Sequence, residues 1–474
     1  MDSSPPRRSP LIIAIILLTL VIATRWTLAP KYLFYFDNIN FALALDHFNP
    51  AKHQPQPPGY PLFVGLEQLI HTVIPSVKYT QLTAGAIGSA LALLAIWYLG
   101  NLLFGAPAGL LATALLLFNP VFWIAGIGNH VRTFLTAMPI VLSICVWQAW
   151  RSEAVGRWFV YSGVALGIAA GFRPELLLLL APLWASTMLR RKLSLAAKAA
   201  GVAALVAAIL PWLVAMALKS GGWHPMTESF DSYFRYHTSD TSFFFGGAPA
   251  RSMKVAVLAV YWTGLGALTW IWAVPFARLR SHAFGLREEF IFLAAWFVPP
   301  FVFHTLIHSD EPDHVLDVVP VVCLAGGLVL SLFHRAHGRF SIPVLATLVA
   351  LLNAFVFFVP LNPPGKEASY RWVREVGDDM TASVDGLRSL PDPGPFEVIL
   401  YKRLTTAHQL AYYFPQDKFF TLDPACPASV KLPAASRVAI LQGGALKQKG
   451  PFLLADPPPH EFRLGACRIT LGAP

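Results

Sequence analysis

Residues 81–104 read QLTAGAIGSALALLAIWYLGNLLF, a run that contains no charged side chain. About 20 apolar residues in a helix span the hydrocarbon core of a bilayer, so this run predicts a membrane-spanning helix. Similar apolar runs recur along the chain. We expect about eleven spans, at residues 11–29, 81–104, 107–126, 132–150, 157–172, 174–189, 199–218, 254–276, 289–307, 314–333 and 341–360. The predicted fold class is therefore mainly α, a polytopic membrane protein.

The composition of the whole chain supports this prediction. Of its 474 residues, 55% are hydrophobic and 13% are charged, whereas a soluble domain carries roughly 25% charged residues. The net charge of +10 comes from Lys and Arg side chains that cluster in short loops between the apolar runs. In a membrane protein such clusters report topology, so the basic balance does not predict nucleic-acid binding.

Basic residues also predict the orientation of the chain. If the N-terminus is cytoplasmic, the inside loops RSEAVGR, RRKLSLAAK, ARLRSHAFGLRE and HRAHGR each carry at least two Lys or Arg. The segments on the other side hold basic residues singly. By the positive-inside rule we expect a multi-pass protein of the plasma or inner membrane, with a cytoplasmic N-terminus and an extracytoplasmic C-terminal end. The first run is too long for a cleaved signal peptide and is expected to be a retained anchor.

Two domains are expected, a transmembrane domain at 1–360 and a second domain at 361–474. The tail opens with proline, glycine and charge, and then alternates strand-like and helix-like stretches, namely FEVILY, TTAHQLAYYF, KFFTL, RVAILQ and CRITLG. This pattern predicts a small extracytoplasmic α/β domain. Cys426 and Cys467 both lie in the tail, where an oxidising compartment permits a disulfide between them.

The loop of residues 30–80 combines aromatic, polar and proline-rich stretches. YFDNINFALALDHF spaces its apolar residues as an amphipathic helix does, which predicts a helix lying in the membrane interface. PLFVGLEQLIHTVIP predicts a second interfacial helix or a short membrane-inserted segment. Between them, HQPQPPGYP at residues 53–61 cannot be a helix interior, because proline fixes φ and lacks the N–H donor. It predicts a rigid elbow.

Asp37 is the single acid in the aromatic stretch that opens this loop. A carboxylate near the membrane interface is costly unless it is used or paired, which makes Asp37 a candidate functional acid. Asp is also a preferred helix N-cap, and the amphipathic run follows directly. Both roles stay open. His53, Gln54 and Tyr60 of the elbow are candidate contacts to a sugar or a phosphate.

Three later turns on the same side are also polar. GNHVR holds Arg132 and GFRPE holds Arg173. Arg173 falls between two short spans, where an arginine at headgroup depth either binds a phosphate or snorkels to the interface. The third turn, HSDEPDH, holds His308, Glu311 and further acids.

The acids of the loops are candidate ligands for a divalent cation, because carboxylates suit Mg²⁺, Ca²⁺ and Mn²⁺. The candidates are Asp37, Asp310 and Asp313. A solvated polar loop is the more common explanation for the last two. The sequence contains no HExxH, Walker A or GxSxG motif, so it does not predict a zinc protease, a P-loop pump or an esterase.

The order of these features resembles the GT-C superfamily of integral membrane glycosyltransferases, in particular bacterial relatives of the protein mannosyltransferase and aminoarabinose transferase group. The resemblance rests on Asp37 in the loop after the first span, on NFALAL and HQPQPPGYPLFV behind it, on GIAAGFRPELLLLLAPL in mid-chain, and on DHVLDVVPVVCLAGGLVL. It extends over essentially the whole chain. It implies a GT-C-like bundle with interfacial helices in the first outer loop.

The resemblance also implies an activity. Members of this group move a sugar, a hexose or a pentose, from a polyprenyl-phosphate carrier to an acceptor at the outer face, usually with inversion. Lipid, glycan and protein acceptors are all compatible with it. By resemblance Asp37 is the first-loop acid and would act as the base, and Arg173 and Arg132 would bind the carrier phosphate. His53, Gln54, Tyr60, His308 and Glu311 would contact the substrate.

The chain departs from the group at one position. Many relatives carry Asp followed by Glu in the first loop, but here Asn38 follows Asp37. A second acid would have to come from Asp46, Glu67 or the loop that begins with HSDEPDH at residue 308, which we call the late loop. The identity of a cofactor is therefore open, with a divalent cation as the candidate.

Two other classes of protein make different predictions. A secondary transporter would show internal repeats and broken helices near the bilayer centre, whereas no repeat is visible and the polar residues lie in the loops. A non-catalytic scaffold for the assembly of lipid-linked glycans would not need Asp37.

Overall fold

The structure is a computed structural model that describes residues 10–190, 192–277, 283–309, 311–338, 340–360, 363–390, 395–401, 403–422, 430–432, 438–442, 452–453, 461–464 and 467–471. The chain forms two compact units. The first comprises Met1–Leu28 and Asn40–Tyr370, and the second comprises Ala29–Ile39 and Arg371–Pro474. The sequence predicted a boundary after residue 360, whereas the second unit also takes in a piece of the first loop.

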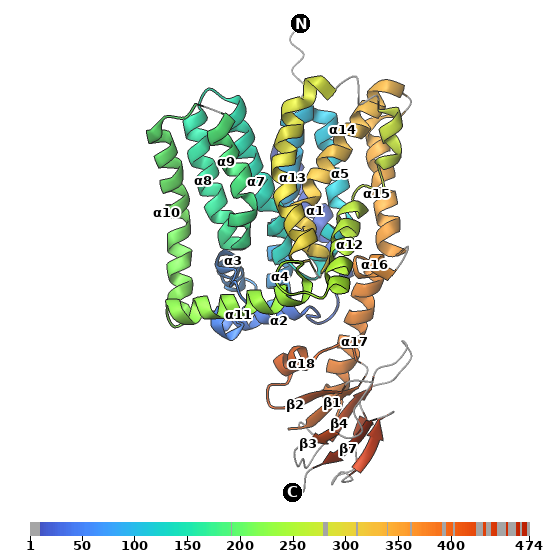
Figure 1. Cartoon of the computed structure of the whole chain (residues 1–474). Coiled ribbons are helices and arrows are strands. Elements are labelled where there is room, and N and C mark those ends of the chain that lie inside the picture. The colour runs from blue at the N-terminus through green and yellow to red at the C-terminus, as the bar shows by residue number, and fades with distance from the viewer. Residues whose placement is uncertain are drawn as a thin grey trace. The chain divides into compact units, whose positions relative to one another are not determined.

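The first unit is built from helices, most of which run side by side (Figure 1). The α-helices are α1 (Pro10–Arg25), α2 (Phe36–Asp46), α3 (Pro61–His71), α4 (Val77–Phe104), α5 (Ala106–Leu117), α6 (Pro120–Ile127), α7 (Val131–Arg151), α8 (Val155–Phe172), α9 (Glu175–Arg190), α10 (Leu195–Lys219), α11 (Trp223–Thr241), α12 (Pro249–Leu265), α13 (Arg287–Leu306), α14 (Val319–His337), α15 (Ile342–Phe358) and α16 (Pro363–Glu367). Short 3₁₀ helices are η1 (Trp26–Leu28), η2 (Pro50–Lys52), η3 (Ile271–Phe276), η5 (Ala283–Leu286) and η6 (Pro312–Asp317).

Each expected span is occupied by helix. Within the described ranges, six helices are long and apolar enough to cross a membrane, namely α4, α7, α8, α10, α13 and α14. The pair α5 and α6 makes a seventh if it counts as one span bent by 55°. Helices α1 and α15 are shorter apolar helices, and the expected span 254–276 is divided between α12 and η3. The predicted polytopic α-helical fold is confirmed.

The bend between α5 and α6 is stabilised by the side chains of Asn119 and Arg25. Asn119 caps α6, because its side-chain oxygen accepts hydrogen bonds from the backbone N–H groups of Val121 and Phe122 at 3.0 and 3.1 Å. The break leaves the carbonyl of Leu117 without its helical partner. The buried guanidinium of Arg25 donates to this carbonyl. The bend therefore directs the chain into the turn that carries Arg132.

Small residues let neighbouring helices approach closely. A Cβ on Gly163 of α8 would lie 2.4 Å from the carbonyl oxygen of Gly201 in α10. A Cβ on Gly327 of α14 would lie 2.4 Å from the carbonyl oxygen of Ala108 in α5. Such contacts are typical of helix packing in membranes, where apolar burial alone does not drive association.

The first loop contains both predicted interfacial helices, α2 and α3, joined by η2 and the elbow. In the elbow His53 and Tyr60 have left-handed backbones with φ of 57° and 48°. Gly59 has φ of 96°, and a Cβ there would lie 2.7 Å from Pro50 and 2.8 Å from Met216 of α10. Only glycine fits this position. The elbow thus packs tightly against α10, as a rigid turn should.

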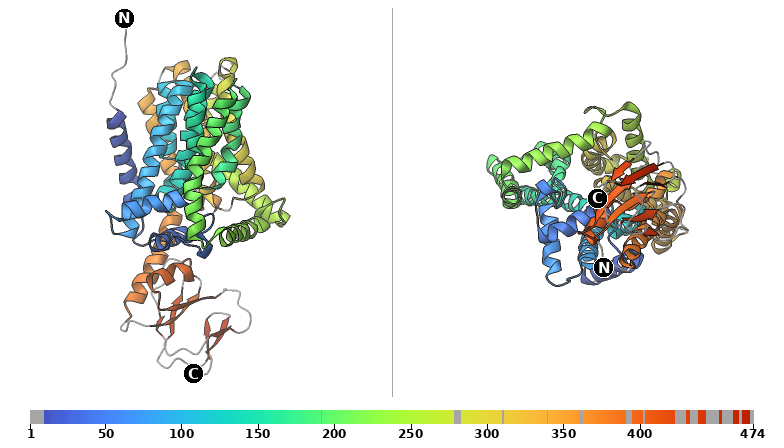
Figure 2. Two further views of the ribbon diagram at one scale, coloured as in Figure 1. Left: turned by 90° about the vertical axis from the view of Figure 1, so that its left-hand side faces the viewer. Right: turned by 90° about the horizontal axis from the view of Figure 1, so that it is seen from below.

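Helix α11 differs in orientation from the others. It lies across one end of the bundle in Figure 1 and runs along the edge of the bundle when viewed from below in Figure 2. Its C-terminal end is hydrogen-bonded to the last residue of α13 and to the residue after it. The hydroxyl of Thr241 donates to the carbonyl of Ile307 at 3.0 Å, and the N–H of Phe243 donates to the carbonyl of Leu306 at 3.1 Å. The long loop 219–253 is therefore an ordered part of the bundle.

The second unit contains α17 (Tyr370–Arg388), α18 (Ala407–Tyr413) and two small sheets. The first sheet has the order β2-β1-β4-β5, with β1 (Glu397–Tyr401) parallel to β2 (Lys418–Leu422) and β4 (Val438–Gln442), and β5 (Phe452–Leu453) antiparallel. The second sheet has the order β3-β7-β6, formed by β3 (Val430–Leu432), β7 (Cys467–Leu471) and β6 (Glu461–Leu464). The predicted α/β character of the tail is confirmed. Cys426 lies outside the described residues, so the expected disulfide stays a prediction.

Candidate active site

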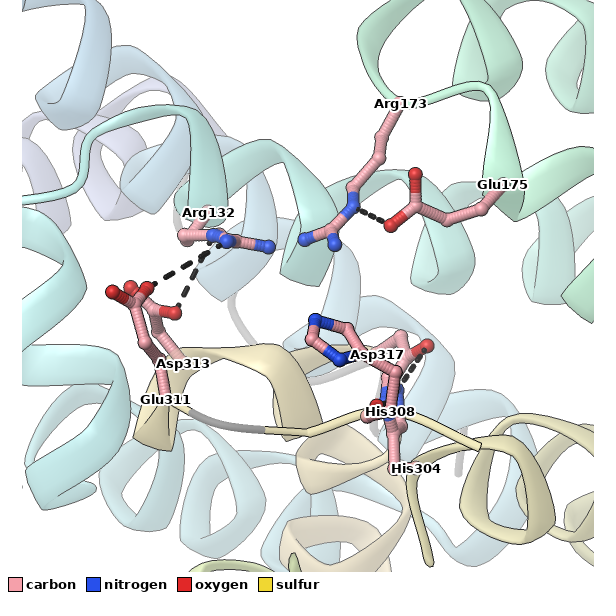
Figure 3. Close-up of polar contacts among 8 residues, drawn as sticks. All are labelled: Arg132, Arg173, Glu175, His304, His308, Glu311, Asp313 and Asp317. Carbon is pink, nitrogen blue, oxygen red and sulfur yellow. Dashed lines mark hydrogen bonds and ion pairs between the residues drawn. The ribbon is translucent and has the colours of Figure 1, made fainter. Parts of the chain in front are cut away.

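Charged and imidazole side chains gather where several helices of the first unit end (Figure 3). Arg132 lies in the first turn of α7, Arg173 in the turn between α8 and α9, and His304 in the last turn of α13. We call this group the charged cluster; it comprises Arg132, Arg173, Glu175, His304, His308, Glu311, Asp313 and Asp317. Short turns between long helices thus bring together residues that are far apart in the sequence.

Arg132 makes ion pairs with the late loop. Its Nε lies 3.4 Å from Oδ1 of Asp313, and its Nη2 lies 3.9 Å from Oε2 of Glu311. The side chains of Arg132 and Asp313 are 4% and 0% exposed, whereas that of Glu311 is 44% exposed. Buried charges are tolerated only when they are paired, so the ion pair with Asp313 fixes the guanidinium of Arg132 in the cluster.

Arg173 reaches the cluster from the other side. Its Nε is ion-paired with Glu175. Its Nη1 is buried and has no hydrogen-bond partner among the described residues. Figure 3 shows the guanidinium groups of Arg132 and Arg173 pointing towards one another. An anion bound between these two guanidinium groups would stabilise both of them.

A buried ion pair closes the late loop. Nε2 of His304 lies 2.9 and 3.0 Å from the two carboxylate oxygens of Asp317, and both side chains are buried. The indole of Trp296 donates to the backbone carbonyl of Asp317 at 3.0 Å. The two ends of the loop are therefore joined, and the residues between them are held in place relative to α13.

Three residues of the late loop could hold a metal ion. Glu311, Asp313 and His314 each offer one ligand atom, and these atoms lie within 4.8 Å of one another. Burial and the charge of Arg132 lower the pKa of His314 well below its ordinary value, so its imidazole is neutral at neutral pH. Two carboxylates and a neutral imidazole fit a divalent cation. Of the predicted ligands, Asp313 belongs to this group and Asp310 lies outside the described residues.

Aromatic rings connect the elbow with the late loop. The ring of His53 lies 6.0 Å from that of Tyr233 on α11, and Tyr233 lies 4.2 Å from His237. His237 in turn lies 5.4 Å from His308, and His308 lies 5.2 Å from His314. Helix α11 thus contributes two rings, Tyr233 and His237, that the sequence analysis did not predict.

The other elbow candidates are placed differently. Gln54 is held through its backbone, because the backbone N–H of Asn49 donates to the carbonyl of Gln54 at 2.6 Å. Tyr60 is buried and packs edge-to-face on Phe41 at 5.4 Å. Nearby, Gln56 is buried with neither its side-chain nitrogen nor its oxygen bonded among the described residues. No charge or motif marked Gln56 in the sequence.

Two further buried groups are unpaired within the described part of the chain. The carboxylate oxygens of Glu67 in α3 and both ring nitrogens of His130, beside Arg132, have no hydrogen-bond partner there. Burial raises the pKa of Glu67 well above its ordinary value and lowers the pKa of His130 to about 3, so His130 is neutral at neutral pH. Glu67, considered above as a second acid, is therefore a buried one whose ionised form is disfavoured.

Asp37 belongs to the second compact unit. It lies in the first turn of α2, one residue past the helix start at Phe36, and so does not occupy the N-cap position. An acid in the first turn still interacts favourably with the helix dipole. Asp46 is the last residue of the same helix and is exposed.

The sequence and the fold have known counterparts. Residues 56–216 match the model of the family described as dolichyl-phosphate-mannose-protein mannosyltransferase. The crystal structure of ArnT from Cupriavidus metallidurans bound to undecaprenyl phosphate shares the fold, with a TM-score of 0.58 and 14% identity over 88% of this chain and 86% of that chain. Both matches support the resemblance to the GT-C superfamily.

Other comparisons agree on the fold. ArnT from Cupriavidus metallidurans in the apo state gives a TM-score of 0.56 at 13% identity, over 87% of this chain and 85% of that chain. The apo oligosaccharyltransferase from Archaeoglobus fulgidus gives a TM-score of 0.50 at 12% identity, over 88% of this chain and 65% of that chain. No curated protein matches the sequence.

The family match covers only part of the candidate site. Arg132, Arg173 and most of the elbow lie within residues 56–216, whereas Asp37 and the late loop lie outside that range. The sequence analysis missed the pair formed by His304, in the last turn of α13, and Asp317, in the late loop. His304 and His308 stand four residues apart at the end of a span, a spacing that places both on one face of a helix and that could have drawn attention to them.

Proposed function

We propose that this chain transfers a sugar, a hexose or a pentose, from a polyprenyl-phosphate carrier to a hydroxyl group of an acceptor at the outer face of the membrane, with inversion. The observation that carries the proposal is the pair of arginines in the charged cluster. Arg132 and Arg173 point towards one another, and Nη1 of Arg173 is buried without a partner among the described residues. A phosphate would satisfy that donor and balance the two charges.

The nature of the carrier is supported by the fold. The ArnT structure with a TM-score of 0.58 is bound to undecaprenyl phosphate. A polyprenyl phosphate combines an anionic head, which two guanidinium groups bind well, with a tail that requires a lipid-facing protein. A membrane-embedded bundle with paired arginines at the end of its helices suits both parts.

In this proposal Asp37 is the base. The acceptor hydroxyl is a weak nucleophile, so a carboxylate takes its proton as the oxygen attacks C1 of the sugar. The new bond joins C1 to the acceptor oxygen, and the bond between C1 and the carrier phosphate breaks. The charge left on the phosphate is stabilised by Arg132 and Arg173. Attack from the face opposite the phosphate inverts the anomeric centre.

A divalent cation would be held by Glu311, Asp313 and His314. When bound, it would supply additional positive charge for the carrier phosphate. Arg132 already lies 3.4 Å from Asp313. Its guanidinium orients this carboxylate.

The test compares Asp37→Asn and Arg173→Gln in the full-length chain, in native membranes that supply the acceptor. A panel of undecaprenyl-phosphate hexoses and pentoses serves as donor, and mass spectrometry measures the undecaprenyl phosphate released. We expect Asp37→Asn to lower kcat by about 10²-fold or more with donor KM little changed. We expect Arg173→Gln to raise donor KM by about ten- to a hundredfold, the size of a lost charged hydrogen bond.

Glu153→Gln and Arg157→Gln are the matched controls, because both residues are outside the charged cluster. They should leave release unchanged. Release at the normal rate by a stably inserted Asp37→Asn variant would remove Asp37 from the role of base. Unchanged donor KM in Arg173→Gln would show that the phosphate binds elsewhere.

A further inference from the structure

We propose that the C-terminal part of the second unit positions the first-loop acid. Residues 31–36 immediately precede Asp37, and α17 and α18 contact every one of them. This inference rests on the proposed role of Asp37, and it assigns to the tail a part in the reaction that is distinct from binding an acceptor. The positioning residues are Gln409 and Tyr413 of α18, supported by Trp372 and Asp385 of α17.

Helix α18 holds the backbone of the segment at two points. The side-chain amide of Gln409 donates to the carbonyl of Phe34, and the N–H of Leu33 donates to the hydroxyl of Tyr413 at 2.9 Å. Gln409 and Tyr413 are four residues apart, so both project from one face of α18. Gln409 is 4% exposed, and a buried amide that loses its partner is costly. These two bonds therefore fix where residues 33 and 34 lie.

The helix that supplies these bonds is itself well fixed. Thr406 and Gln409 form a capping box at its N-terminus, in which Gln409 Oε1 accepts from the N–H of Thr406 at 2.7 Å. The one glutamine side chain thus caps α18 with its oxygen and holds the first loop with its nitrogen. Burial raises the pKa of Tyr413, so its phenol stays protonated.

Aromatic rings hold the side chains of the same segment. Phe34 and Tyr35 lie 6.1 and 5.2 Å from Trp372, and Tyr32 lies 5.4 Å from Tyr413. Phe36, the residue before Asp37, lies 4.5 Å from the ring of His408. Such pairs add stability beyond their buried area and restrict the ring orientations.

An exposed group completes the contact. Nζ of Lys31 lies 2.8 Å from Asp385, and the hydroxyl of Tyr32 donates to the same carboxylate at 2.6 Å. Pro30 also packs closely against α17, since a Cβ on Gly377 of this helix would lie 2.6 Å from Pro30. The contacts therefore run without a gap from residue 30 to residue 36.

The mechanical consequence follows from the position of Asp37. Helix α2 begins at Phe36, so the held segment leads into the helix with no intervening loop. Phe36 and Asp37 are consecutive residues of the first helical turn, whose carbonyl groups accept backbone hydrogen bonds from the next turn. Loosening residues 33–36 would therefore move or disorder the carboxylate of Asp37, and with it the proton transfer.

Two nearly isosteric substitutions test this. Gln409→Glu keeps an oxygen that caps α18 but removes the N–H donor to Phe34. Tyr413→Phe keeps the ring against Tyr32 but removes the acceptor for the N–H of Leu33. In the double variant of the full-length chain, we expect hydrogen exchange of the amides at 31–36 to become at least tenfold faster. We also expect kcat for release of undecaprenyl phosphate to fall about tenfold, with donor KM unchanged.

Thr406→Val is the matched control, because it removes the other half of the capping box and touches none of residues 31–36. A merely structural role would give the same loss for this control. Faster exchange at 31–36 with normal kcat would overturn the positioning role, and so would unchanged exchange. Absence of turnover by the wild-type chain, with faster exchange in the double variant, would refute the proposed function alone and leave the contact between the tail and the first loop established.

Discussion

The first-loop segment 31–36 and the late loop 308–317 are held in place by different forces. Neutral hydrogen bonds and aromatic rings hold the first-loop segment, with one exposed ion pair at its start. Buried charges hold the late loop, through His304 with Asp317 and Arg132 with Asp313. Losing one neutral hydrogen bond costs about 1–3 kcal/mol when a buried group is left unsatisfied, whereas a buried charge without its partner costs about 3–5 kcal/mol.

The difference matches what each loop is proposed to do. The late loop would hold a cation and fix Arg132 for the phosphate, so it needs fixed charges at fixed positions, and buried pairs supply that geometry. The first-loop segment only has to present one acid. Neutral contacts along residues 33–36 are sufficient for that.

The largest effect is expected from breaking the buried pair of the late loop. His304→Leu leaves Asp317 as a buried, unpaired carboxylate, and should lower the free energy of unfolding by about 3–5 kcal/mol. The double variant His304→Leu/Asp317→Leu should lose less than the sum of the single variants, because no lone charge remains. Unfolding in detergent, followed by fluorescence, measures both.

The exposed pair of Arg151 and Glu288, 2.7 Å apart, is the control for this experiment. Arg151→Ala should change the free energy of unfolding by about 0–1 kcal/mol, as is usual for surface pairs. A loss of similar size in His304→Leu and Arg151→Ala would show that the late loop does not depend on buried charge.

A smaller effect is expected from the metal ligands of the late loop. Glu311→Gln or His314→Ala should weaken binding of Mn²⁺ by at least about tenfold, since each removes one ligand of a small set. Electron paramagnetic resonance of free Mn²⁺ measures the binding directly. Glu228→Gln is the control, because Glu228 is an exposed acid on α11 paired with His224. Equal Mn²⁺ affinity in wild type and both ligand variants would exclude this site.

The smallest effect is expected at the exposed end of the first-loop segment. The hydrogen bond from Lys31 lowers the pKa of Asp385 below its ordinary value of 3.8. A lowered carboxyl pKa means that the ionised carboxylate contributes its full stabilisation at pH values above its ordinary pKa. This stabilisation is lost as the pH falls through the pKa of the folded state. Exchange at 31–33, corrected for its intrinsic rate, should therefore be constant from pH 8 to 5 and accelerate only below about pH 4.

Asp385→Asn should abolish this acid step and leave the exchange at 34–36 nearly unchanged. The exposed pair is screened by water, so kcat should hardly change at neutral pH. An acid step that persists in Asp385→Asn would assign the protonation to another group of the second unit.

Much of the fold could be predicted because its signals are local. An apolar run such as 81–104 predicts its own helix whatever it packs against, and FEVILY and KFFTL became β1 and β2. The site was predicted in part for the same reason, since Arg132, Arg173, Glu311 and Asp313 stand out as charges in short loops. The pair of His304 and Asp317 was missed because each lies at the edge of an apolar span.

By itself, the sequence determined that the chain folds into many apolar helices, where the polar turns between them lie, and that residues 53–61 form an elbow, because hydrophobicity and proline act over a few residues. Only the tertiary structure decided which turns meet and which groups are paired. It joined His304 to Asp317, directed Arg132 and Arg173 towards one another, and packed residues 30–36 against α17 and α18. Such pairings depend on how distant segments pack, and no local pattern encodes a contact between residues 34 and 409.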